Sequence, residues 1–109
     1  MANTFKLKTK ANVGVTTVGI YTAPAATTTV VIGITMANTS GSGVNVGVGI
    51  TRAGTTEAVK LLKNAPVPQG SSLEFMAGNK IVLEATDTVT VDSDTNNSID
   101  AALTIMEIT

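Results

Sequence analysis

Hydrophobic and polar residues alternate along several short segments of this chain, and such a period of two is typical of β-strands. The clearest segments are residues 29–37, 43–51, 87–92 and 98–109. Clusters rich in Gly, Pro, Ser, Asn and Asp separate them, at residues 24–26, 38–43, 53–55, 66–72, 77–79 and 93–97. Strands of 6 to 12 residues between such turns predict an all-β fold, a single antiparallel β-sandwich of about eight strands, jelly-roll or immunoglobulin-like.

The expected core faces follow directly from the alternation. Residues 43–51 read GVNVGVGIT, with branched apolar residues at every second position and Asn, Gly and Thr between them. We expect Gly47 and Gly49 to leave room for another backbone or subunit to lie close. The residues predicted to share core faces are Val30, Ile32, Ile34 and Met36; Val44, Val46, Val48 and Ile50; Val89 and Val91; and Ile99, Ala101, Leu103 and Ile105.

Two segments allow more than one interpretation. Residues 56–64 are the only helix candidate, but their Thr and Val content and the following Ala65-Pro66 favour a strand. Gly78-Asn79 could close a two-residue hairpin that places Phe75 opposite Val82, and a longer loop is the alternative. The expected organisation is an N-terminal arm or edge strand at residues 1–11 and a sandwich domain at residues 12–109.

Composition points to assembly. The 109 residues suit one domain, but only three of them are aromatic, so Val, Ile, Leu and Ala must form the core. We expect such a monomer to be marginally stable unless it also buries surface against other subunits. The net charge is −1, with residues 1–56 at about +4 and residues 57–109 at about −5. This asymmetry could help neighbouring copies meet head to tail.

The absence of Cys and His excludes disulfides, thiolate catalysis, Cys-ligated zinc and every Ser-His or Cys-His arrangement. Glu74 and Glu84 could form a carboxylate pair, but solvent-facing charges are the preferred interpretation. The spacing of Asp92, Asp94 and Asn96 is that of the first ligands of a calcium-binding loop. The Gly and the bidentate Glu that such a loop also needs are missing, so we expect a polar turn. A structural cation at these residues stays an open alternative. No catalytic, cofactor-binding or metal-binding residue is predicted.

Lys6, Lys8 and Lys10 alternate with Phe5 and Leu7 near the N-terminus. They could form an arm that lies across an acidic neighbour, or an edge strand whose lysines discourage uncontrolled sheet pairing. Nucleic acid is not an expected partner, because no stacking aromatic lies near them. Arg52 stands where a dinucleotide fingerprint would have its third glycine, which excludes that motif. The candidate subunit contacts are Lys6, Lys8, Lys10, Gly47, Gly49 and Arg52.

The N-terminal residues MANTFKLKTKAN have no apolar stretch like that of a secretory signal. No apolar run approaches the ~18 residues that a membrane helix requires. We therefore expect a protein that is made in the cytoplasm and does not enter the membrane.

Two stretches carry a family resemblance. IYTAPAATTTVVIGITMANTSG and VPQGSSLEFMAGNKIVLEATDTVTVDSD, together with the ending LTIMEIT, resemble small virion structural proteins of tailed bacteriophages in their turn and strand motifs. Ala26 and Thr86 stand where that pattern often has Gly. Their replacement suggests that these turns use negative φ here, or that Asp87 caps its turn differently.

This resemblance implies a non-enzymatic virion subunit, made in the host bacterial cytoplasm and present in many copies. A capsid decoration or cement protein is the first expectation, with a trimer or other small symmetric oligomer and the major capsid protein or another virion protein as partners. A small tail, neck or baseplate protein is the alternative. A carbohydrate-binding adhesin module is a second alternative, although carbohydrate-binding sites usually use the ring faces of Trp and Tyr.

Overall fold

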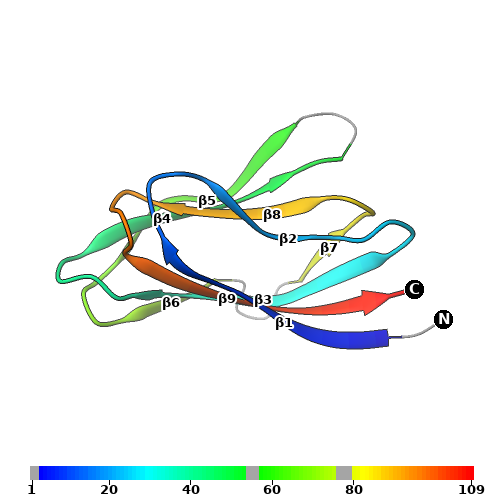
Figure 1. Ribbon diagram of the computed structural model, residues 1–109, viewed down its shortest axis with the longest axis horizontal. Helices are drawn as coiled ribbons and strands as arrows, with labels where there is room; N and C mark the ends of the chain where they lie inside the picture. Colours follow the sequence, from blue (N-terminus) through cyan, green and yellow to red (C-terminus); the bar gives the residue numbers. More distant parts are fainter. Residues whose placement is uncertain (1–2, 54–56, 76–79) are drawn as a thin grey trace.

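Two antiparallel sheets pack face to face in the computed structural model, which describes residues 3–53, 57–75 and 80–109 (Figure 1). Its strands are β1 (Asn3–Val13), β2 (Val18–Thr22), β3 (Thr28–Asn38), β4 (Val44–Thr51), β5 (Ala58–Val67), β6 (Ser72–Phe75), β7 (Ile81–Leu83), β8 (Thr88–Ser93) and β9 (Ile99–Ile108). Within these residues the chain contains no helix that could span a membrane.

The strand order identifies a jelly roll. The five-stranded sheet has the order β1-β9-β3-β6, with β7 also paired to β3, and the four-stranded sheet has the order β2-β8-β4-β5. If β6 and β7 are counted as two parts of one edge strand, the first strand pairs with the last, the second with the seventh, the third with the sixth and the fourth with the fifth. This nested pairing is a long hairpin rolled into two sheets. It confirms the predicted sandwich and favours its jelly-roll form.

The core lies between the sheets and follows the predicted alternation in three strands. The predicted inward residues of β4, β8 and β9 are at most 8% exposed. In β9 the inward series continues beyond Ile105 to Glu107, which is 7% exposed. A carboxylate therefore lies at one end of an otherwise apolar interior.

The predicted core face of β3 is wrong in its first half. The register between β3 and β9 shifts between Val31 and Gly33, which marks Ile32 as the extra residue of a β-bulge. An extra residue reverses which side chains point inward. Val31 is consequently buried and Val30 only half-buried, whereas Ile34, after the bulge, is buried as predicted.

The sequence left open whether residues 73–76 pair with residues 80–83, and the described strands β6 and β7 are not paired with each other. Both β6 and β7 pair antiparallel with β3, so that Phe75 lies opposite Ile34 and Val82 lies opposite Val30. The two short strands therefore follow one another along the same edge of the sheet. Gly78-Asn79 itself lies outside the described residues. The preference for a strand over a helix after residue 56 is confirmed by β5.

Two turns adopt the conformation that their residue types argued against. Ala26 has φ 57° and Thr86 has φ 66°, so the expected negative φ is wrong at both positions. The two turns are hydrogen bonded to each other: the Ala23 amide donates to the Asp87 carbonyl at 2.9 Å, and the Thr86 amide donates to the Ala23 carbonyl at 2.8 Å. These bonds help to hold the left-handed backbone without glycine.

Candidate assembly surfaces

A buried polar cluster fastens the N-terminal edge strand to the interior. The Tyr21 hydroxyl of β2 donates to Glu107 Oε2 at 2.6 Å and lies 2.8 Å from Thr29 Oγ1. Lys6 Nζ of β1 lies 2.9 Å from Glu107 Oε1. The cluster thus joins β1, β2, β3 and β9, strands from both sheets.

The pKa values of this cluster follow from the same contacts. Hydrogen bonds from Tyr21 and Lys6 lower the pKa of Glu107 below its ordinary value of 4.5, against the opposing effect of burial. Burial, and then the hydrogen bond to Glu107, raise the pKa of Tyr21 from 10.0 to about 12. At neutral pH the pair is therefore a carboxylate and a neutral phenol.

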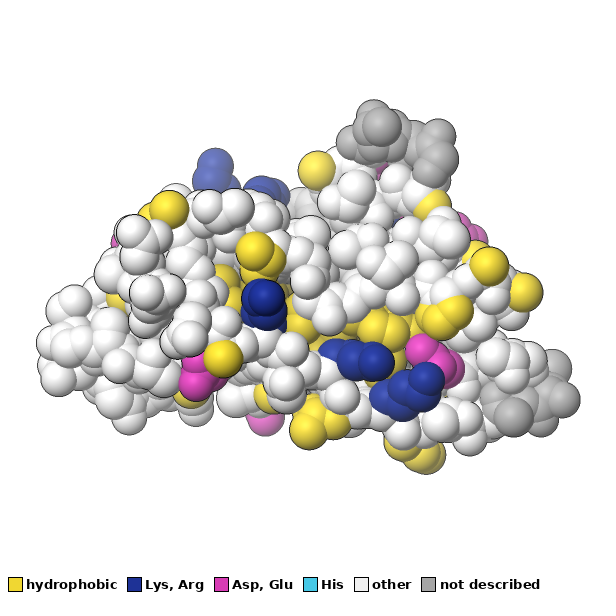
Figure 2. Space-filling model, in the orientation of Figure 1, with side chains coloured by type: hydrophobic (Ala, Val, Ile, Leu, Met, Phe, Trp, Pro, Cys, Tyr) yellow, Lys and Arg dark blue, Asp and Glu magenta, His cyan; other side chains and the backbone are white. Residues whose placement is uncertain are grey.

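The three lysines of β1 point toward the inner side of the five-stranded sheet. Lys6, Lys8 and Lys10 pair in register with Ile105, Leu103 and Ala101 of β9, whose side chains face the core. Figure 2 shows basic side chains in a line along this edge, in front of hydrophobic side chains between the sheets. Inward-pointing charges at an edge oppose the addition of another strand.

The charge asymmetry of the sequence is partly compensated within the fold, because nested pairing brings the basic first half against the acidic second half. Lys6 pairs with Glu107, and Arg52 pairs with Glu84 and Asp87. These cations of the first half are thus already bonded within the chain. The lysines remain proposed subunit contacts, but Lys6 has a structural role in its own chain.

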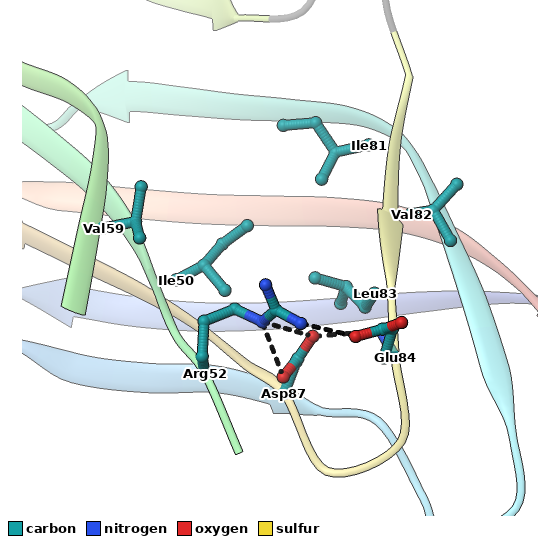
Figure 3. A pocket seen from close by; sticks show the side chains of 8 residues that line it. All are labelled: Ile50, Arg52, Val59, Ile81, Val82, Leu83, Glu84 and Asp87. Atoms are coloured by element: carbon teal, nitrogen blue, oxygen red, sulfur yellow. Dashed lines mark hydrogen bonds and ion pairs between the residues drawn. The ribbon is translucent and has the colours of Figure 1, made fainter. Parts of the chain in front are cut away.

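Arg52 lies at the mouth of a cleft of about 430 Å³ at the opposite edge of the sandwich, between β5 and β7. Its side chain points toward the carboxylates of Glu84 and Asp87, and its Nε lies 3.2 Å from Asp87 Oδ2 (Figure 3). The apolar residues lining the cleft are Ile50, Val59, Ile81, Val82 and Leu83. The charged groups of the cleft are therefore bonded to each other.

Asp87 is the centre of that group and only 2% exposed. Its carboxylate accepts the Ala53 amide at 2.9 Å and the Glu84 amide at 3.0 Å, besides the Arg52 guanidinium. Burial alone raises the pKa of Asp87, but these hydrogen bonds outweigh it and hold the pKa below its ordinary 3.8. A carboxylate bonded in this way stabilises the turns around it and is a poor acid or base.

Gly47 and Gly49 are closely packed by the chain itself. A Cβ at Gly49 would lie 2.9 Å from the Val59 carbonyl oxygen, and one at Gly47 would lie 2.5 Å from Asp92 Oδ1. The backbone that approaches these glycines belongs to β5. A contact of this face with another subunit stays a proposal.

The candidate carboxylate pair of the sequence, Glu74 and Glu84, is not brought together by the fold. Glu74 lies beside Thr35 of β3, whereas Glu84 follows Leu83, which pairs with Thr29. Six residues along a strand separate the two carboxylates by about 20 Å, which is too far for an acid and nucleophile pair.

The acidic turn after β8 uses its carboxylates in separate hydrogen bonds. Asp92 accepts from Thr17 and Lys60, and Asp94 accepts the Asn45 amide at 3.1 Å. No cluster of three or more His, Cys, Asp or Glu residues that could hold a metal ion occurs in the part of the chain that the structure describes. Tyr21, the chain's one tyrosine, is 7% exposed, so its ring is not available to stack on a sugar.

The sequence interpretation missed a surface on the outer side of the five-stranded sheet. Phe5 pairs with Met106, Met106 with Val30, and Val30 with Val82, so four apolar side chains follow one another across β1, β9, β3 and β7. Phe5 is 69% exposed and Val82 is 60% exposed. We call these four residues the outer apolar row.

The outer side of the four-stranded sheet differs in character. Its outward positions on β4 and β8 alternate with the core valines and consist of Asn, Gly, Thr and one Asp; Asp92 is paired with Lys60 of β5. This side of the molecule is therefore polar. The two sheets present unlike surfaces to their surroundings, and the outer apolar row lies on only one of them.

Comparisons with known proteins reveal similarity in fold only. No family model and no curated protein matches the chain. Among solved structures, a chain of the Bacillus endospore appendages, a family of disulfide-linked pili, has a TM-score of 0.57 at 17% identity, covering 99% of this chain and 87% of that one.

Two viral chains are also similar. A chain of the T13 IBDV viral particle has a TM-score of 0.59 at 13% identity, covering 96% of this chain. A chain of infectious bursal disease virus strain Gx has a TM-score of 0.57 at 13% identity, covering 95%. The present chain spans 30% and 33% of these two chains, so it corresponds to about one third of each. Its fold is thus shared with chains of an assembled appendage and of virus particles.

Proposed function

We propose that this chain is a non-enzymatic virion structural protein, in the first place a capsid decoration or cement subunit that stabilises a particle through symmetric protein contacts. The observation that carries the proposal is the outer apolar row. Four apolar side chains are aligned across four strands, and the two at the ends of the row, Phe5 and Val82, are more than half exposed. Such a row is expected to be covered by protein in the assembled particle.

The charged groups support a structural role as well. The carboxylates with shifted pKa values, Asp87 and Glu107, are held by backbone amides, a tyrosine and cations of the same chain. Such contacts lock turns and strands together, and among the described residues that line the cleft beside Arg52 the charged groups are bonded to one another. The chemistry of the described residues therefore favours a building block over an enzyme.

The fold comparisons are compatible with this role. Jelly rolls occur in viral capsid proteins and in lectin domains, so the fold alone does not decide between them. The burial of Tyr21 speaks against a lectin-like site. Because the chain has no Cys, its copies cannot be joined by disulfides, unlike the disulfide-linked pili.

The test is the protein content of particles. We expect quantitative mass spectrometry of purified virions, produced by the virus that carries this gene, to detect the chain in a fixed copy number. A number that follows the icosahedral capsid supports decoration, whereas a number that follows the tail axis would instead indicate a tail, neck or baseplate protein. Absence of the chain from purified particles would contradict the proposal.

A further inference from the structure

The outer side of the five-stranded sheet is almost free of charge. Within its strands, the outward residues around the outer apolar row are mainly Thr, Ala and further apolar residues such as Leu7 and Ile108. The outward charged residues of these strands are Asp100 and Glu74, which lie toward one end of the sheet. A second surface of the same kind can approach this one without strong like-charge repulsion.

The size of the surface suits a stable pair. The ten residues of β9 extend over roughly 34 Å, and four strands side by side cover roughly 19 Å, which gives an area of about 650 Å². Specific, stable interfaces bury about 600–1,000 Å² on each partner, so this area lies at the lower end of that range. The sheet is therefore large enough to hold a dimer by face-to-face packing, in which sheets lie about 10 Å apart.

We infer that a second copy of this chain covers the outer apolar row, with a two-fold axis parallel to the strands between the two sheets. This inference rests on the proposed function and specifies how the subunits meet. The axis reverses the order of strands in the partner. Phe5 then packs on Val82 of the second copy, and Met106 packs on Val30, so a larger side chain meets a smaller one at each contact.

The same two-fold rotation keeps the carboxylates of the two copies apart. Glu74 shares a register row with Thr35, Ala102 and Thr9, so it meets the second copy near Thr9 of the lysine-bearing strand β1. Asp100 pairs with Ala37 and meets Ala37 of the second copy. No carboxylate of these strands faces another across the interface, as an isologous contact requires.

Cysteine cross-linking tests this geometry cleanly, because the natural sequence contains no Cys. The variants Phe5→Cys and Val82→Cys, both at exposed positions, are mixed and treated with a bifunctional thiol reagent that spans about 10 Å, the separation of packed sheets. We expect a cross-linked dimer from the mixture and little from either variant alone, because position 5 lies roughly 14 Å across three strand spacings from position 5 of the second copy, in addition to that separation. Thr22→Cys, exposed on the other sheet, serves as the control and should not cross-link.

A charge substitution tests the affinity. Phe5→Lys should raise the dimer dissociation constant at least about tenfold in sedimentation experiments. Val15→Lys is the matched control, because Val15 is 57% exposed but lies outside the sheet, in the connection from β1 to β2. Circular dichroism verifies that both variants remain folded.

Three results would overturn the inference: a wild-type monomer at all concentrations, faster cross-linking of one variant with itself than with the other, or an unchanged dimer in Phe5→Lys. A monomer that is nevertheless found in purified particles refutes the dimer and leaves the proposed function standing. If the chain forms the dimer but is absent from purified particles, the proposed function is refuted and the inferred dimer stands.

Discussion

The Tyr21 hydroxyl donates a 2.6 Å hydrogen bond to the Glu107 carboxylate, between β2 of one sheet and β9 of the other. The carboxylate also holds Lys6 of the edge strand, so three strands depend on this one acceptor. The bond connects residues that lie 86 positions apart in the sequence. It fixes the end of the sandwich where the N-terminal strand meets the C-terminal one.

This bond predicts an unusual tyrosine titration. Tyr21 is the chain's one tyrosine and there is no Trp, so the near-ultraviolet absorbance of phenolate reports this residue alone. We expect a midpoint of about 12 in the folded chain, against 10.0 for an ordinary phenol. In Glu107→Gln the midpoint should fall, because the negative partner is removed. A wild-type midpoint near 10.0 would contradict the buried pair.

The same shift determines the alkaline stability. Because the folded pKa of Tyr21 is raised, the folded state keeps the proton longer than the unfolded state does. The stabilising effect is complete below pH 10.0 and is lost as the pH rises through about 12. Tyr21→Phe should remove this part of the pH dependence and cost about 1–3 kcal/mol of unfolding free energy at neutral pH. Urea denaturation at several pH values measures both effects.

Acid stability depends on the two carboxylates with lowered pKa values. For Glu107 and Asp87 the unfolded state binds the proton more readily, so their contribution is complete above the ordinary values of 4.5 and 3.8 and is lost as the pH falls through the folded values. We expect the free energy of unfolding to fall below about pH 4.5. Glu107→Gln should make that fall less steep; an equally steep curve would refute the role of Glu107.

The left-handed turn residues offer a stabilising substitution. Thr86 is β-branched and has φ 66°, a conformation that glycine adopts without strain. Thr86→Gly should therefore stabilise the chain by about 0.5–1 kcal/mol, seen as a higher melting temperature. The neighbouring exposed Ala85 has no positive φ, so Ala85→Gly should have the opposite sign. Equal losses in both variants would show that Thr86 is not strained.

The glycines of β4 predict a sharp contrast. Gly49→Ala would bring a Cβ to 2.9 Å from the Val59 carbonyl, and we expect it to cost about 1–3 kcal/mol because backbone must shift. Gly33→Ala in β3 has no atom within 4 Å of the added Cβ and should be close to neutral. Thermal unfolding measures both. If the two glycines tolerate alanine equally, β5 does not approach β4 as described.

The sequence predicted those parts of the fold that depend on local alternation. The faces of β4, β8 and β9 are correct because each strand is regular along its inward series. The face of β3 is wrong in its first half because a bulge at Ile32 adds one residue, and nothing in a period-two pattern marks that residue. The pairing of Phe75 with Val82 that the sequence allowed is not formed, because β3 offers an edge long enough for both β6 and β7.

The candidate surfaces were less predictable, because they depend on which strands become neighbours. Lys6 was recognised, but Glu107 was not, since only the pairing of the first strand with the last brings them together. Phe5 and Val30 lie 25 positions apart and join one row only through β9 between them. The alternation of Phe5 and Leu7 with lysines was the one local signal of that row.

The central claim is that this jelly roll is a building block whose outer apolar row is covered within a particle. An electron cryomicroscopy reconstruction of purified virions tests it most directly. We predict density for the chain at regularly repeated, symmetry-related positions, with Phe5, Met106, Val30 and Val82 buried against protein. A reconstruction in which these four side chains of every copy face solvent would contradict it.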